Sequence, residues 1–218
     1  MARPELLHTM ISLPRLYAIV DSSAHESTRD LVAFAKELLV GGCSLLQYRN
    51  KSGNARMMLE QARELRQLSR AGAPAPHLRL TMNDRADLCL AAGFDGVHVG
   101  QEDLSPEAVR GIIGRARWLG VSTHNAEQLR EADLTSADYL AIGPVFATSS
   151  KDKPDPIIGL EGVRRARALT RKPIVAIGGI TRANAASVIE AGADSVAVIS
   201  DLLREPRKSA EEFFRVLR

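Results

Sequence analysis

Hydrophobic residues fall along the chain in two alternating kinds of segment. Short aliphatic runs, such as "LYAIV" and "IVAIG", are continuously hydrophobic, which is typical of parallel strands buried on both faces. The runs occupy residues 16–20, 44–48, 78–82, 96–99, 117–121, 139–143, 174–178 and 195–199. Longer amphipathic segments between them predict helices over residues 27–40, 54–71, 84–92, 105–115, 125–133, 160–171, 182–191 and 208–217. The pattern therefore predicts eight consecutive strand-and-helix units.

Capping residues support the ends of these helices. Ser105, Pro106 and Glu107 have the order expected for an N-cap, a first helical position and a first turn. Several predicted helices end at glycine, as in "LLVGG" and "LAAGFD". The segments "AAGFDGVHV" and "EAGADSVAV" repeat one pattern of helix end, glycine, aspartate and strand.

The number of units decides the fold class. Eight alternating strands and helices in 218 residues predict an α/β protein with the TIM (β/α)8 barrel fold. We expect a single domain, with a catalytic barrel over residues 14–218 and a short N-terminal extension over residues 1–13. A doubly wound open sheet is the alternative, and closure of the sheet distinguishes the two.

Composition narrows the class of protein further. The chain is 45% hydrophobic and 25% charged, which is typical of a globular domain. Its net charge of +3 comes from interspersed acids and bases, so it favours small anionic ligands over nucleic acid. Charged and proline residues interrupt the apolar N-terminal stretch, so we expect neither a signal peptide nor a membrane span. These features predict a cytoplasmic protein without nucleic-acid or membrane partners, and they leave open whether it forms a homo-oligomer.

Polar residues follow most of the predicted strands, at the end of a barrel where ligands bind. In the second strand, Gln47, Arg49 and Lys51 occupy every second position, so their side chains point the same way. The positions after the other strands are Asn83, Asp84, His98, Gln101, Asp103, Ser122, His124, Thr148, Ser149, Ser150, Lys151, Gly178, Gly179, Ile199 and Ser200. Their shared location predicts one polar site at the mouth of the barrel.

Charged residues in this set indicate the kind of ligand. Asp84 and Asp103 supply hard carboxylate oxygens, which suit Mg²⁺. Arg49, Lys51 and Lys151 supply charge-assisted hydrogen bonds for a diphosphate. A metal with three cations exceeds the needs of a monophosphate, so we expect a diphosphate substrate.

Two further segments are typical of a second anion site. Gly178–Gly179 and Ile199–Ser200 follow the last two strands, where backbone N–H groups often approach a phosphate in this fold. Two anion sites on one rim imply two phosphorylated substrates or one long substrate.

Each residue also has a simpler structural explanation. Arg49 and Lys51 can extend into solvent from a strand end. Asp84 can cap the following helix, and Asp103 can be an ordinary loop acid. His124 can be a hydrogen-bonded structural histidine. The joint placement of these residues on one rim favours the functional interpretation.

With these residues in view, the chain resembles the thiamine phosphate synthase family, also called thiamine-phosphate pyrophosphorylases. The resemblance lies in seven segments that occur in the family's order: "QYRNK", "NDR", "HVGQED", "GVSTH", "GPVFATSSK", "AIGGI" and "VIS". It extends from about Leu16 to Leu203, and Ala147 stands where the family often has proline.

The resemblance implies a transferase that condenses 4-amino-5-hydroxymethyl-2-methylpyrimidine diphosphate with 4-methyl-5-(2-hydroxyethyl)thiazole phosphate. The products would be thiamine phosphate and pyrophosphate, formed with the help of Mg²⁺ bound to Asp84 and Asp103. Residues implied to bind the pyrimidine diphosphate are Gln47, Tyr48, Arg49, Asn50, Lys51, Asn83, Ser122 and Lys151. Those implied to act in catalysis are Arg49, Lys51, Ser122 and Lys151. Those implied to bind the thiazole phosphate are Thr148, Ser149, Ser150, Gly179, Ile199 and Ser200.

A thiazole tautomerase-like isomerase on the same barrel is the alternative. Such relatives can use a histidine at the position of His124 for proton transfer, and they tend to lack the acid of "HVGQED". Asp103 is present here together with the diphosphate set, which favours the synthase. A barrel that only carries a thiamine precursor would need no carboxylates for a metal.

Overall fold

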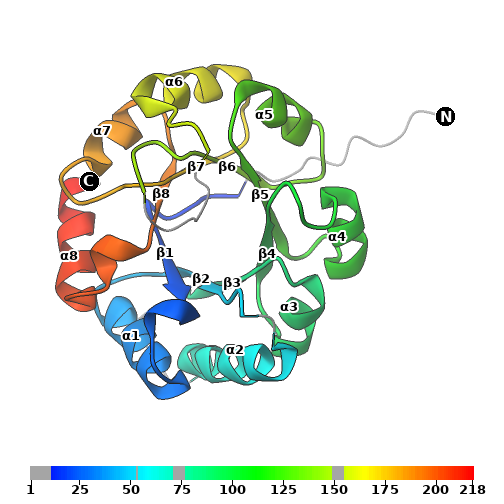
Figure 1. Ribbon diagram of the computed structural model, residues 1–218, viewed down its shortest axis with the longest axis vertical. Coiled ribbons are helices and arrows are strands. Elements are labelled where there is room, and N and C mark those ends of the chain that lie inside the picture. Colours follow the sequence, from blue (N-terminus) through cyan, green and yellow to red (C-terminus); the bar gives the residue numbers. More distant parts are fainter. Residues whose placement is uncertain (1–10, 53, 71–76, 149–154) are drawn as a thin grey trace.

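The computed structural model describes residues 11–218, except residues 53, 71–76 and 149–154. Its strands form a closed parallel barrel in the order β1-β2-β3-β4-β5-β6-β7-β8. Pairing of Leu16 in β1 with Val196 in β8 closes the ring, which confirms the TIM barrel and excludes the open sheet. Figure 1 shows the strands enclosed by a ring of helices.

The elements lie within a few residues of their predicted positions. The strands are β1 Leu16–Asp21, β2 Leu45–Arg49, β3 Arg79–Asn83, β4 Gly96–Val99, β5 Trp118–Thr123, β6 Tyr139–Ile142, β7 Ile174–Ile177 and β8 Ser195–Val198. The helices are α1 Thr28–Val40, α2 Ala55–Arg70, α3 Ala86–Ala92, α4 Pro106–Ile113, α5 Ala126–Asp133, α6 Gly159–Leu169, α7 Ala185–Glu190 and α8 Pro206–Val216. Short 3₁₀ turns follow β1 at Ser22–Ala24 and β8 at Ser200–Leu202. As predicted, Ser105 caps α4, accepting a hydrogen bond from the backbone N–H of Ala108.

Hydrophobic side chains form two clusters, one on each face of the barrel wall. The outer cluster lies between the strands and the helices and includes Leu46 of β2. The inner cluster fills the barrel, and Ile11 and Leu13 pack against it. The end of the segment predicted as an extension therefore lies against the barrel interior.

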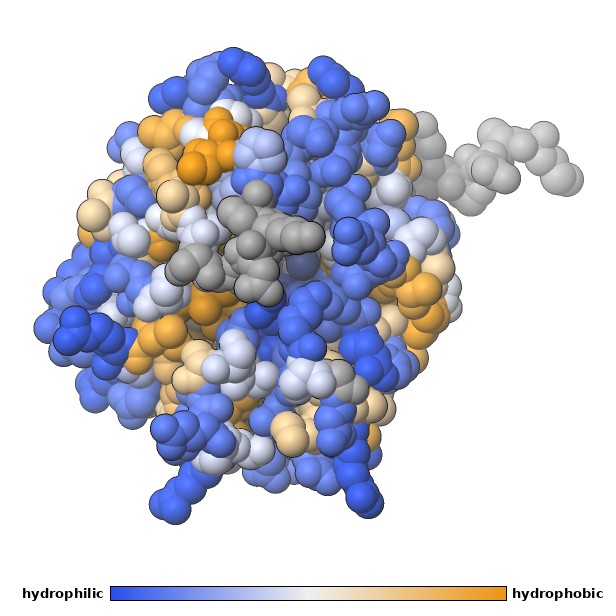
Figure 2. Space-filling model, in the orientation of Figure 1, coloured by the Kyte–Doolittle hydropathy of each residue, from blue (hydrophilic) through white to orange (hydrophobic). Residues whose placement is uncertain are grey.

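Figure 2 shows the character of one face of the outer surface. On the face drawn in Figure 2, hydrophilic residues predominate and hydrophobic residues form separate small patches. Within the described ranges, every helix is too short or too polar to cross a bilayer. The aliphatic runs are thus used mainly in the two interior clusters.

Three aspartates with the same role explain the repeated aspartate before a strand. Each precedes an even-numbered strand and accepts hydrogen bonds from an arginine and from a backbone N–H of the preceding strand. The sets are Asp95 with Arg66 and Leu80, Asp138 with Arg110 and Leu119, and Asp194 with Arg167 and Ile174. These aspartates lie at the amino-terminal ends of the strands, which in this fold is the stabilising end.

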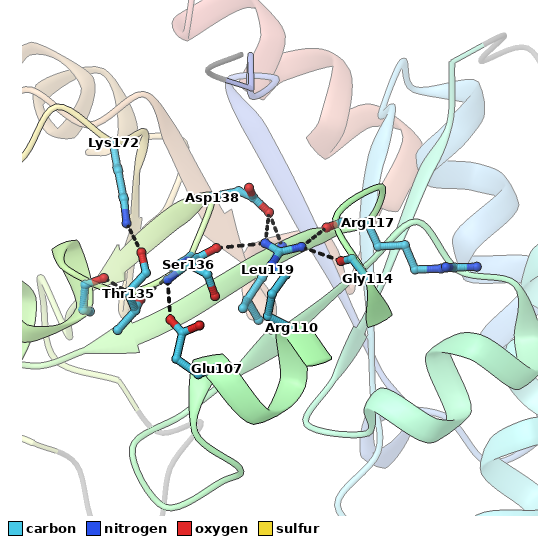
Figure 3. A network of polar contacts seen from close by, with 11 residues as sticks. Glu107, Arg110, Gly114, Arg117, Leu119, Thr135, Ser136, Asp138 and Lys172 are labelled. Atoms are coloured by element: carbon cyan, nitrogen blue, oxygen red, sulfur yellow. Dashed lines mark hydrogen bonds and ion pairs between the residues drawn. The ribbon is translucent and has the colours of Figure 1, made fainter. Parts of the chain in front are cut away.

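Arg110 illustrates how one such set joins several elements. Its guanidinium lies 2.7 Å from the Asp138 carboxylate and also donates to the backbone carbonyls of Gly114, Arg117 and Ser136 (Figure 3). Both charged side chains are largely buried, with 11% and 15% of their surface exposed. The network joins α4 to the beginnings of β5 and β6.

Gly120 in β5 makes room for Tyr139 inside the barrel, because a Cβ at this position would overlap the tyrosine ring. We expect Gly120→Ala to lower the free energy of unfolding by about 1–3 kcal/mol, the usual cost of overpacking a core. Gly111 in α4 is the matched control, since no described atom beyond its chain neighbours and its own helix backbone lies within 4 Å of a Cβ built there. Gly111→Ala should raise stability by up to about 1 kcal/mol through helix propensity. Urea unfolding of both variants checks the pair, and equal stabilities would contradict the packing argument.

Candidate active site

A pocket of about 720 Å³ opens where the carboxyl ends of the strands meet. Many of the predicted site residues line it, although they come from elements that are distant in sequence. They are Gln47, Arg49, Lys51, Asn83, Asp84, Asp103, Ser122, Thr148, Gly179, Ile199 and Ser200. The barrel therefore brings these side chains together at one mouth.

The alternation of β2 sorts its residues between the pocket and the outer cluster. Gln47 and Arg49 line the pocket, and Lys51 follows them on the same side. Gln47 donates a hydrogen bond of 2.9 Å to the hydroxyl of Tyr17. Arg49 forms an ion pair with Asp21 at the end of β1, the residue with which it is in register. Asp21 was missed by the sequence reasoning, because its place beside Arg49 depends on the pairing of two strands.

The side chains of Tyr48 and Asn50 lie outside the pocket, and the binding role that the resemblance implies for them stays a prediction. Tyr48 is 1% exposed and belongs to the outer cluster, where its hydroxyl donates to Gln61. The Asn50 amide donates to Tyr48 and Gln61 at 3.1 Å each. Because successive side chains of a strand point to opposite faces, residues between Gln47, Arg49 and Lys51 must face the helices.

Asp103 lies close enough to Asp84 to affect the pKa of the Asp84 carboxyl. Burial raises the pKa of the Asp84 carboxyl, the Lys51 ammonium opposes this, and the nearby Asp103 raises it further. Lys51 Nζ lies 2.5 Å from Asp84 Oδ2, and Asp103 Oδ2 accepts from the backbone N–H of Gly100 at 2.7 Å. The result is a lysine and two carboxylates around one part of the mouth.

Asp84 does not cap the following helix, so that structural explanation is wrong. Helix α3 begins at Ala86, and Arg85 occupies its N-cap position. The backbone of Asp84 has a φ of +62°, a left-handed conformation that residues other than glycine rarely adopt. This backbone conformation directs a carboxylate into the pocket instead of toward the helix, and such strain is typical of functional sites.

The two carboxylates fit a magnesium ion. Mg²⁺ commonly takes one or two protein carboxylates and completes its shell with water and substrate phosphate oxygens. Residues 11–218, apart from the gaps named above, contain no group of three or more His, Cys, Asp or Glu arranged to hold a metal. A cation between Asp84 and Asp103 would also relieve the repulsion that raises the pKa of Asp84.

The opposite side of the mouth is built from backbone. Gly178 and Gly179 have φ values of +100° and +63°, and a Cβ on either would collide with the segment after β6. Ile199 and Ser200 line the same pocket from the end of β8. The two glycines let the end of β7 pack directly against the segment after β6, and both line the pocket.

Other predicted residues have different outcomes. Ser149, Ser150 and Lys151 lie outside the described residues. Gln101 donates to the backbone carbonyl of Ser122 at 2.6 Å, and its side chain lines the pocket. His124 Nδ1 lies 2.8 Å from the carbonyl oxygen of Gly143 and 3.5 Å from Asp155, so its ring is held by partners.

Buried polar residues beneath the pocket form a network that the sequence reasoning did not identify. It contains Tyr17, Thr81, His98 and Tyr139, which lie inside the barrel, and it reaches Ser122 at the pocket wall. The available signal was the alternation within "LYAIVD" and "YLAI", which places Tyr17 and Tyr139 inside the barrel.

Known proteins match the part of the chain that contains these site residues. A family described as thiamine monophosphate synthase matches residues 16–202. The thiamine-phosphate synthase of Koribacter versatilis is 58% identical over 210 residues, covering 95% of this chain and 97% of the relative. The thiamine-phosphate synthase of Chloroflexus aurantiacus is 46% identical over 187 residues, with 85% and 83% covered.

A solved structure agrees with these relatives. The thiamine phosphate pyrophosphorylase of Pyrococcus furiosus superimposes with a TM-score of 0.81 at 35% identity, over 93% of this chain and 95% of that one. The fold, the pocket and the matched segments therefore lead to one conclusion. The chain belongs to the thiamine monophosphate synthase family and is a transferase.

Proposed function

We propose that this transferase joins 4-amino-5-hydroxymethyl-2-methylpyrimidine diphosphate to 4-methyl-5-(2-hydroxyethyl)thiazole phosphate, forming thiamine phosphate and pyrophosphate. The observation that carries the proposal is that two cations and two carboxylates line the pocket together: Arg49, Lys51, Asp84 and Asp103. Such a wall suits a diphosphate bound together with a metal ion. The similar proteins described above are named for the same product.

The reaction makes few chemical demands on the protein. The bond between the exocyclic carbon of the pyrimidine and the diphosphate oxygen breaks, and its electron pair leaves with the diphosphate. The aminopyrimidine ring spreads the positive charge left on the carbon, and the thiazole nitrogen then attacks this carbon. Arg49 and Lys51 stabilise the charge that grows on the diphosphate, and the pocket holds the two rings in line. No side-chain nucleophile takes part.

Asp84 and Asp103 are the residues that would hold Mg²⁺, which helps to neutralise the departing diphosphate. Lys51 pairs with Asp84 in the structure, so it is held beside this position. From there its ammonium can donate to the departing diphosphate, while Asp84 and Asp103 would hold the metal.

Asn83 offers a hydrogen-bond donor for the first substrate. Within the described part of the chain its buried amide nitrogen has no hydrogen-bond partner, and the side chain lines the pocket with 8% of the residue exposed. A buried donor without a partner costs about 1–3 kcal/mol. An acceptor atom of the pyrimidine diphosphate at this point would remove that cost.

The second substrate belongs on the glycine side of the mouth. Thr148, Gly179, Ile199 and Ser200 line this part of the pocket. We assign the phosphate of the thiazole to the Gly179 and Ser200 region, where backbone can approach an anion. Ser149, Ser150 and Lys151, which lie outside the described residues, are assigned their roles by resemblance alone.

A reconstituted reaction tests the proposal. Purified protein with both substrates and Mg²⁺ should yield thiamine phosphate and an equal amount of pyrophosphate. An excess of EDTA should stop the reaction, and Mg²⁺ added beyond the chelator should restore it. Absence of thiamine phosphate from the complete mixture would refute the function, and undiminished turnover in EDTA would refute the metal.

An isomerase acting on the thiazole phosphate is the second candidate, because His124 also lines the pocket. Its Nδ1 donates to the Gly143 carbonyl, which leaves Nε2 able to accept a proton. Such an isomerase would act without the pyrimidine substrate, and it would release no pyrophosphate. Incubation with the thiazole alone distinguishes it from the transferase.

A further inference from the structure

A continuous line of hydrogen bonds runs from the pocket into the barrel. His98 Nε2 lies 2.8 Å from Ser122 Oγ, and His98 Nδ1 lies 3.1 Å from the Tyr139 hydroxyl. The Tyr139 hydroxyl lies 3.1 Å from that of Tyr17, which makes a short hydrogen bond with Thr81. Thr81 Oγ1 donates to the backbone carbonyl of Leu46 at 3.4 Å, where the line ends.

Every side chain in the line between Ser122 and the Leu46 carbonyl is largely shielded from water. Tyr17, Thr81 and Tyr139 are at most 1% exposed, and His98 is 8% exposed. Burial raises the pKa of both tyrosines and lowers that of His98 to about 4. The hydroxyls therefore keep their protons, and His98 is neutral, with one donor nitrogen and one acceptor nitrogen.

The carbonyl at the inner end sets the direction of the whole line. A carbonyl can only accept, so Thr81 donates to Leu46 and accepts from Tyr17. Tyr17 gives its one proton to Thr81, so its oxygen accepts from Gln47 and from Tyr139. Tyr139 then accepts from His98 Nδ1, which leaves Nε2 as the acceptor for Ser122.

We propose that His98 and Tyr139 are positioning residues that hold the hydroxyl proton of Ser122 toward the barrel interior. Ser122 Oγ then presents only lone pairs to the pocket and selects a ligand that offers an N–H donor. Under the proposed function, on which the identity of the ligand rests, this donor is the exocyclic amine of the aminopyrimidine. The direction of the line does not depend on that function.

The arrangement predicts discrimination against an oxo group. A 4-oxo analogue would place a carbonyl oxygen against the lone pairs of Ser122, so neither atom would have a proton to share. Sites that hydrogen-bond one polar group usually reject the analogue without it strongly. We expect the enzyme to bind the 4-amino pyrimidine diphosphate at least about tenfold more tightly than the 4-oxo analogue.

Nitrogen NMR of protein labelled with ¹⁵N-histidine tests the direction without substrate. The His98 signals are assigned by their loss in His98→Asn. We expect Nδ1 to carry the proton and Nε2 to be bare. A proton on Nε2 would overturn the proposal, because Ser122 would then accept from His98 and donate into the pocket.

Tyr139→Phe tests the consequence. It removes the hydroxyl that accepts the Nδ1 proton of His98, so this proton should move to Nε2. The Ser122 hydroxyl would then accept from Nε2 and donate its own proton into the pocket. The preference for the amino over the oxo ligand should fall at least about fivefold, as measured by calorimetry, a loss typical of one buried hydrogen bond. Ser195→Ala is the matched control, since it also removes one fully buried hydroxyl, which donates to the Arg15 carbonyl and takes no part in the line.

The outcomes separate this proposal from the proposed function. An unchanged tautomer and an unchanged preference in Tyr139→Phe would refute the positioning role. If the wild-type protein bound neither pyrimidine, the proposed function would fail, and the histidine tautomer would still decide the direction of the line.

Discussion

Lys51→Ala is expected to lower kcat by about 100-fold or more, the usual cost of losing one electrostatic partner of a transition state. The Lys51 ammonium lies 2.5 Å from Asp84, at the position where the diphosphate is proposed to leave. Its side chain is 55% exposed, so its ion pair contributes little to stability and the variant should fold normally. Steady-state kinetics with both substrates, together with thermal unfolding, checks this prediction.

Lys208→Ala is the control for Lys51→Ala. Lys208 of α8 is 60% exposed and pairs with Glu205 at the N-cap of that helix, and neither residue lines the pocket. Its removal should leave kcat within about twofold, since exposed ion pairs of this kind are weak. Near-normal turnover of Lys51→Ala, or an equal loss in Lys208→Ala, would show that Lys51 has no special role.

The fold follows from features that are local in the sequence. Runs such as "LYAIV" and "IVAIG" are hydrophobic on both faces because each strand packs against the barrel interior and the helices at once. Pro106 and Ser105 fix the beginning of α4 within the chain itself. Because eight such units form a closed barrel in this fold, the pairing of β1 with β8 follows from their number.

The placement of the site residues was predictable wherever alternation along a strand was applied. Gln47, Arg49 and Lys51 share the pocket for this reason. The binding role of Tyr48 and Asn50 is implied by the resemblance alone, and the same alternation directs their side chains outward. The chemical roles of the pocket residues stay predictions.

Contacts between strands lay beyond the reach of a single sequence. The line from Ser122 to Leu46 joins six strands, and its side chains are single polar residues within apolar segments. Which of them meet depends on the register of every strand pair. The same holds for Asp21, which reaches Arg49 only because β1 and β2 align these two residues.

Arg49→Lys is expected to lower kcat/KM by about 100-fold although it keeps the positive charge. Arg49 uses one nitrogen of its guanidinium for Asp21, which is 5% exposed and also accepts from Ser23. The remaining nitrogens can face the diphosphate at the same time, because a guanidinium presents five donors in a fixed plane. A lysine ammonium is a single point charge, so it cannot reach Asp21 and the substrate together.

Arg66→Lys is the matched control for this substitution. The Arg66 side chain is 24% exposed, as is that of Arg49, and it pairs with Asp95 at the stabilising end of the barrel. Both variants should lose a similar amount of stability in urea unfolding, because each weakens one ion pair of an arginine. The loss of kcat/KM should appear in Arg49→Lys alone, and wild-type kinetics in that variant would mean that Asp21 and the diphosphate do not share the guanidinium.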